Sequence, residues 1–94
     1  ILERNFRFGH AEIDIISRKD NILHIVEVKT RNSSAYGEPE SFVNQQKIDL
    51  LVRATNYYMQ KTDLDLEVQF DIISIVKNNV EFTINYIEDA FYPF

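Results

Sequence analysis

Residues 22–29 read Ile-Leu-His-Ile-Val-Glu-Val-Lys, and this stretch decides the fold class. It is apolar on both faces over much of its length, which is typical of a central strand. Successive side chains of a strand point to opposite faces, so Glu27 and Lys29 share one face and Val28 takes the other. Charges on a central strand are rare unless they are paired or hold a metal ion. The stretch therefore predicts a central strand that carries a functional site.

Two further strands are expected before this one. Residues 1–8 alternate between polar and apolar side chains and fit an edge strand, and residues 12–17 read Glu-Ile-Asp-Ile-Ile-Ser and fit a second strand. Short polar breaks separate the three segments. They predict an antiparallel meander, in which Asp14 and Glu27 lie on adjacent strands and face the same side.

The second half of the chain predicts one helix and two more strands. Apolar residues recur at helical spacing from Asn44 to Lys61, and Asn44 or Ser41 is the candidate cap. A polar loop is expected before this helix, at residues 30–41. Two strands joined by a turn are expected after it, at residues 67–76 and 80–87, followed by an aromatic tail at residues 89–94 that packs back on the domain. The expected fold is an α/β domain over residues 1–94, with the order β-β-β-α-β-β.

Composition suits one small domain of 94 residues, with 45% apolar residues and 7 Phe and 5 Tyr to build a core. The chain has no cysteine, which excludes disulfides and thiolate zinc sites and suits a reducing cytoplasm. No apolar run reaches the ~18 residues of a membrane span, so we expect no membrane partner and a cytoplasmic location.

The net charge of −5 counts against nucleic-acid binding, which usually leaves a basic footprint. The charge is uneven, however. Residues 1–31 carry six Lys/Arg against five acids, a balance of +1, whereas residues 32–94 carry four against ten, a balance of −6. A bound cation would neutralise part of the acidic charge and weaken the objection.

The paired carboxylates predict a divalent cation site. Asp14 and Glu27 would supply carboxylate ligands and Val28 its carbonyl oxygen, a donor set that suits Mg²⁺ or Mn²⁺. Such a cation can activate water and stabilise charge during phosphodiester hydrolysis, with Lys29 close to the attacking water. Glu12 shares the face of Asp14 and is an accessory candidate, either in the metal shell or at a second ion.

Each of these residues also has a structural interpretation. Glu27 and Lys29 would form an exposed ion pair if their strand lay at a sheet edge. Lys47 on the helix would be a solvated residue, and Arg31 either contacts phosphate or caps the loop that follows the strand. The two histidines are too isolated in the sequence to be predicted as ligands.

Two segments carry a family resemblance. ILERNFRFGHAEIDII at residues 1–16, followed by LHIVEVKTRNSSAYGEP at residues 23–39, resembles the YraN-like family of bacterial proteins. The resemblance continues to the end of the chain in Lys47, Ala54 and Tyr58, in residues 70–73 and in residues 89–91.

The resemblance implies a restriction-endonuclease-like fold close to that of Holliday junction resolvases, with a mixed sheet flanked by helices and a PD-(D/E)xK site. Asp14 matches the metal-binding aspartate of that motif, Glu27 its second acid and Lys29 its lysine. Glu12 matches the acid that precedes the aspartate, and Lys47 matches a helix lysine. The implied activity is metal-dependent cleavage of DNA, including branched DNA, by a homodimer.

The sequence departs from the family pattern at two points. Ala11 stands where the family has a glycine before Glu12, and we expect the chain to lack the helix that precedes the first strand in related nucleases. Two alternatives therefore stay open. One is a non-catalytic nucleic-acid-binding or assembly module that keeps the fold, and the other is a protein-interaction domain that uses the aromatic tail.

Overall fold

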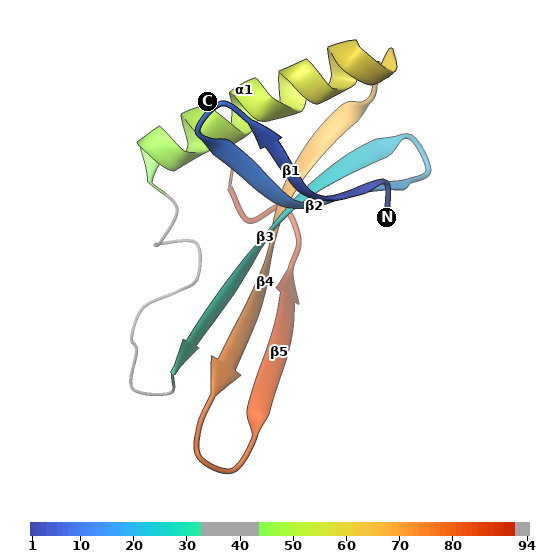
Figure 1. The fold of residues 1–94 in the computed structure, drawn as a ribbon. Helices are drawn as coiled ribbons and strands as arrows, with labels where there is room; N and C mark the ends of the chain where they lie inside the picture. Colours follow the sequence, from blue (N-terminus) through green and yellow to red (C-terminus); the bar gives the residue numbers. More distant parts are fainter. Residues whose placement is uncertain (33–43, 92–94) are drawn as a thin grey trace.

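The computed structural model describes residues 1–32 and 44–91, which form a five-stranded mixed sheet and a helix (Figure 1). The elements are β1 (Glu3–Phe8), β2 (Ala11–Lys19), β3 (Ile22–Asn32), α1 (Gln45–Thr62), β4 (Glu67–Lys77) and β5 (Phe82–Ile87). The strands lie in the sheet in chain order; β3 and β4 pair in parallel and the other neighbours are antiparallel. The predicted α/β class, element order and three-strand meander are confirmed.

A tight turn joins β1 to β2. Phe8 pairs with Ala11, so Gly9 and His10 form a two-residue hairpin loop, and Gly9 has a φ of +60°. A glycine at the first position of such a loop adopts positive φ without the steric cost of a side chain. Strand β1 lies at the edge of the described sheet, as predicted, and Phe6 is its one buried residue.

Strand β3 lies in the middle of the sheet and pairs with β4 from Ile22↔Glu67 to Asn32↔Lys77. The predicted end of this strand at Lys29 was therefore wrong. The parallel ladder continues to satisfy the backbone groups for three more residues, although their side chains are polar. Arg31 consequently lies within β3 rather than in a loop beyond it.

The helix begins where the sequence predicted. Asn44 is the N-cap, and its side-chain Oδ1 accepts a hydrogen bond of 2.9 Å from the backbone N–H of Lys47. Ser41, the other candidate cap, lies outside the described residues. The helix ends at Thr62, and the C-cap residue Asp63 adopts the left-handed conformation with φ 56°. No helix in the described ranges combines the length and apolar character that crossing a membrane requires.

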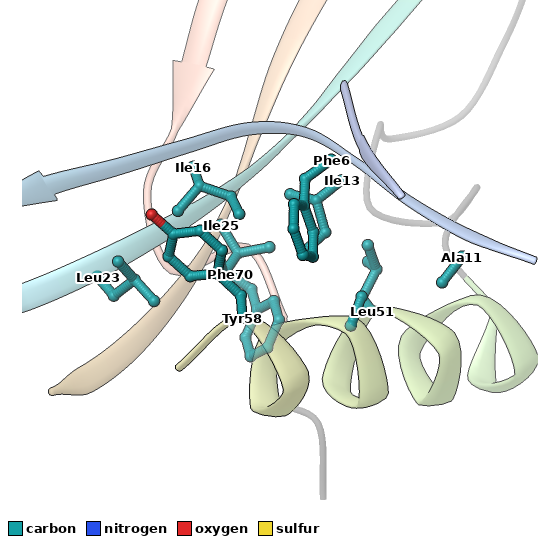
Figure 2. Packing of buried hydrophobic residues seen from close by; sticks show 10 residues of the cluster. Phe6, Ala11, Ile13, Ile16, Leu23, Ile25, Leu51, Tyr58 and Phe70 are labelled. Atoms are coloured by element: carbon teal, nitrogen blue, oxygen red, sulfur yellow. The ribbon is translucent and has the colours of Figure 1, made fainter. Parts of the chain in front are cut away.

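The main core lies between α1 and one face of the sheet. Figure 2 shows Leu51 and Tyr58 of the helix packed against side chains from β1 to β4. The rings of Phe6 and Tyr58 meet edge to face, with centroids 5.2 Å apart, and Tyr58 is buried in this core. Fully burying such a side chain contributes about 1.5–3 kcal/mol, so this layer holds the helix in place.

The C-terminal region differs in one boundary from the expectation. The side-chain Oδ1 of Asn78 accepts hydrogen bonds from the backbone N–H groups of Val80 and Glu81, which withdraws them from strand pairing. Strand β5 therefore begins at Phe82 instead of Val80. The predicted return of the tail is confirmed as far as Phe91, whose ring stacks on Phe70 at 5.2 Å; residues 92–94 lie outside the described residues.

Candidate metal centre between β2, β3 and α1

Glu27 continues the row of β3 side chains that faces the helix. Leu23 and Ile25 of this row belong to the core, and Glu27 is the next residue on the same face. Its side chain is only 4% exposed. The interpretation of Glu27 as part of an exposed ion pair on an edge strand is therefore wrong, because β3 is central and α1 covers this face.

Asp14 lies beside Glu27 at the place where the pairing of β2 and β3 changes. The ladder runs from Lys19↔Ile22 to Ile15↔Val26, so the next position along each strand places Asp14 opposite Glu27. There the Oδ2 of Asp14 accepts a hydrogen bond of 2.8 Å from the backbone N–H of Val28. In a regular ladder the Val28 N–H would donate to a backbone carbonyl group of the neighbouring strand, but here it donates to the side-chain carboxylate of Asp14.

The same geometry gives Val28 a suitable orientation. In an antiparallel pair the N–H and C=O of one residue point to the same neighbouring strand. Because the Val28 N–H points to Asp14, its carbonyl oxygen is directed to the same side of β3. By this geometry the Val28 carbonyl oxygen is a candidate third ligand beside the two carboxylates at the junction of β2 and β3.

The charge of Glu27 is only partly compensated. Burial raises the pKa of its carboxyl group, and the nearby Asp14 raises it further, while Lys47 and Lys29 lower it by less. The Nζ of Lys47 lies 3.4 Å from Oε2 of Glu27. The other oxygen, Oε1, is buried without a hydrogen-bond partner in the described part of the chain. Such an orphaned oxygen is expensive unless a ligand satisfies it.

Other predicted residues are less closely associated with this site. Lys29 is half-buried on β3, beside Ser74 of β4. Glu12 forms an ion pair of 2.9 Å with Arg7 of β1, whereas Glu27 contacts Lys47 of α1. Arg31 is the next residue after Lys29 on the same face of β3.

The donor set fits a hard divalent cation with few protein ligands. Over residues 1–32 and 44–91, no cluster of three or more His, Asp or Glu residues is arranged to hold a metal ion. A cation here would depend on Asp14, Glu27, the Val28 carbonyl and water. Mg²⁺ commonly binds through one or two carboxylates and keeps several waters, so the residues present fit this ion.

A second polar cluster, which sequence reasoning missed, lies on the opposite face of the sheet. Asp71 of β4 is fully buried, and its carboxylate accepts hydrogen bonds from four donors, which we call the Asp71 cluster: His24 Nδ1, Gln69 Nε2, the Tyr86 hydroxyl and the Asp89 backbone N–H. Burial alone would raise the pKa of Asp71, but these hydrogen bonds lower it below its usual value.

The sequence did contain a signal for this cluster. Asp71 interrupts an apolar run on β4, just as Glu27 interrupts one on β3, and His24 interrupts β3 on the other face. A pocket of about 320 Å³ lies beside the cluster and is lined by Ser17, Lys19, His24, Tyr86 and Glu88. Both oxygens of Asp71 accept hydrogen bonds, whereas Oε1 of Glu27 has no partner in the part of the chain that the structure describes, so Glu27 is the better candidate for a ligand and Asp71 fits a structural role.

Comparison with known proteins identifies the family. The model of "Uncharacterised protein family UPF0102" matches residues 1–75. The chain belongs to the UPF0102 family. This is the YraN-like family that the two sequence segments resembled.

UPF0102 relatives match over the whole chain. A UPF0102 protein of Flavobacterium psychrophilum is 57% identical over 94 residues, which cover 100% of this chain and 79% of the relative. UPF0102 proteins of Christiangramia forsetii and Flavobacterium johnsoniae are 47% and 48% identical, again over 100% of this chain and 79% and 80% of the relatives. Both candidate carboxylates lie within the part of the chain that the family model matches.

Proposed function

We propose that this protein is a Mg²⁺- or Mn²⁺-dependent endonuclease that hydrolyses DNA phosphodiester bonds at a restriction-endonuclease-like PD-(D/E)xK site. One observation carries the proposal. The carboxylate of Glu27 is buried beside Asp14, and its Oε1 has no hydrogen-bond partner among the described residues. A protein tolerates such a costly arrangement where it serves binding or catalysis.

The residues divide the chemistry between them. Asp14, Glu27 and the Val28 carbonyl would hold the cation. When bound, the cation supplies an activated water and positive charge beside the scissile phosphate. Lys29 follows Glu27 on the same face of β3, where its ammonium group would orient the water and stabilise negative charge as it develops on the phosphate.

The acidic net charge of −5 opposes DNA binding by electrostatic repulsion. A divalent cation at the site removes part of the local repulsion, so DNA binding should require the cation. Branched DNA is the substrate class that the resemblance to resolvases implies. A homodimer, which would present two sites to opposed strands, belongs to the same proposal and is tested by analytical ultracentrifugation.

Cleavage of labelled four-way junction, flap and linear DNA in Mg²⁺, Mn²⁺ or EDTA tests the proposal. We expect metal-dependent cleavage that falls roughly 100-fold or more in Asp14→Asn and Glu27→Gln, because each loses a ligand charge. Glu67→Gln, at the exposed start of β4, is the matched control and should keep full activity. Failure of the folded wild-type protein to bind Mg²⁺ or Mn²⁺ in calorimetry would refute the metal centre.

A non-catalytic nucleic-acid-binding or assembly module is the second candidate, favoured by the acidic charge of the chain. A protein carrying both Glu27→Ala and Lys29→Ala distinguishes the two functions. If this variant binds DNA as the wild type does, and the wild type shows no metal-dependent cleavage, the module is correct. An interaction surface on the aromatic tail is less favoured, because Phe91 packs inward on Phe70.

A further inference from the structure

Lys47 occupies an unusual place for a cation. It lies in the first turn of α1, where the N-terminal end of the helix dipole disfavours positive charge, and this turn contains no acidic residue. Helix stability therefore does not explain a lysine here. The contact that does explain it is with the sheet, because Nζ lies 3.4 Å from Oε2 of Glu27.

The two partners differ in their freedom to move. The side chain of Glu27 is 4% exposed and sits on a central strand, whereas the side chain of Lys47 is 37% exposed. The backbone of Lys47 is held by the Asn44 cap, but its four-carbon stem lets the ammonium group swing towards solvent. Lys47 can leave the pair without exposing the core, and Glu27 cannot.

Lys47 and a divalent cation would compete for the same carboxylate. Lys47 contacts Oε2 of Glu27, and Oε1 has no hydrogen-bond partner within residues 1–32 and 44–91, so this ion pair only partly compensates the buried charge. Two positive charges within a few ångströms of one another in a partly buried site repel strongly. A cation that binds Glu27 must therefore weaken or displace the contact with Lys47.

We propose that Lys47 is a displaceable counter-ion, which neutralises Glu27 until a divalent cation binds and then turns its ammonium group to a phosphate oxygen of bound DNA. This inference rests on the proposed function and adds a coupling to it. Metal binding releases Lys47 for the substrate, so the affinities for metal and DNA are linked, and the linkage is reciprocal. Lys47 is a positioning residue in the first state and a substrate contact in the second.

Mn²⁺ titration tests the first half of the proposal. In Lys47→Met, which keeps the stem and removes the charge, Mn²⁺ should bind about tenfold more tightly than in the wild type at pH 8. Lys47→Gln provides a second variant with a polar tip. Arg53→Met removes one charge from an exposed position of the same helix and should leave Mn²⁺ affinity unchanged.

DNA binding tests the second half, with a labelled four-way junction in Ca²⁺ or in EDTA. Lys47→Met should bind DNA about fivefold more weakly than the wild type in Ca²⁺ and equally in EDTA. An Mn²⁺ affinity in Lys47→Met that is equal to or lower than that of the wild type overturns the inference. So does an equal loss of DNA affinity in Ca²⁺ and EDTA. If the wild type binds Mn²⁺, such a result refutes the role of Lys47 alone, whereas absence of Mn²⁺ binding in every variant refutes the metal centre itself.

Discussion

Replacing Glu27 by methionine should stabilise the metal-free protein. Methionine is unbranched like glutamate and fills irregular apolar space, and the position already lies in the row of core residues on β3. Removing the poorly satisfied carboxylate relieves about 1–3 kcal/mol of desolvation cost. The lost ion pair with Lys47 offsets at most about 1 kcal/mol, because that lysine is partly exposed and returns to water. The expected net effect is a gain of up to about 2 kcal/mol at pH 7.

The gain should depend on pH in a defined direction. The pKa of Glu27 is raised above its usual value of 4.5, chiefly by burial and then by Asp14. A raised folded-state pKa means that the folded wild-type protein binds the proton more tightly than the unfolded chain does. The wild type is therefore relatively most stable below pH 4.5 and loses that contribution as pH rises through the raised folded pKa. The advantage of Glu27→Met should be largest at pH 7–8 and shrink as pH falls towards 4.5.

Urea unfolding in EDTA, followed by circular dichroism across pH 4.5–8, measures this gain. Thermal scans should show the same change as a rise of roughly 4–8 °C in melting temperature for each kcal/mol. Glu67→Met at an exposed position is the control and should change stability by less than about 0.5 kcal/mol. A Glu27→Met protein that is less stable than the wild type would show that Glu27 is a structural residue, and a gain that is the same at every pH would show that the pKa of Glu27 is not raised in the folded protein.

Two further substitutions test the Asp71 cluster and the N-cap of α1. Asp71→Asn should destabilise the protein by about 2–4 kcal/mol in urea unfolding. The substitution removes the negative charge that strengthens the hydrogen bonds of the Asp71 cluster. Since the pKa of Asp71 is lowered, its stabilisation is present above pH 3.8 and disappears as pH falls through the folded value; equal stability of the two proteins at pH 7 would contradict this. Asn44→Ala should cost about 1 kcal/mol in thermal unfolding by removing the helix cap, whereas Asn44→Ser should cost much less; equal losses in the two variants would argue against the cap.

Local patterns predicted most of the secondary structure. The helical spacing of apolar residues and the Asn44 cap placed α1 within one residue at each end, because both signals act within a few residues of chain. The central position of β3 also followed from its residues, which are apolar on both faces. The predicted second strand, residues 12–17, was too short, because β2 spans Ala11–Lys19. Two further boundaries were wrong for non-local reasons. Strand β3 is extended by pairing with β4, and β5 is shortened by the turn bonds of Asn78.

The candidate site was predicted in part. Alternation along β2 and β3 indicated that Asp14 and Glu27 would lie together, and the structure places them at the end of one ladder. Glu12, by contrast, shares the parity of Asp14 but pairs with Arg7, because β1 offers a cation at that position. The partners of Asp71 come from three different strands and the segment after β5, so no single stretch of sequence could reveal them.

The sequence by itself determined the strand and helix order, the cap of α1 and the presence of charged residues in an apolar strand, because these follow from the period and chemistry of neighbouring residues. Only the tertiary structure decided that Glu27 is buried under α1, that Lys47 reaches its carboxylate, and that one of its oxygens has no partner among the described residues. The physical reason is that burial and electrostatic environment depend on which elements pack together, and those contacts join residues far apart in the chain.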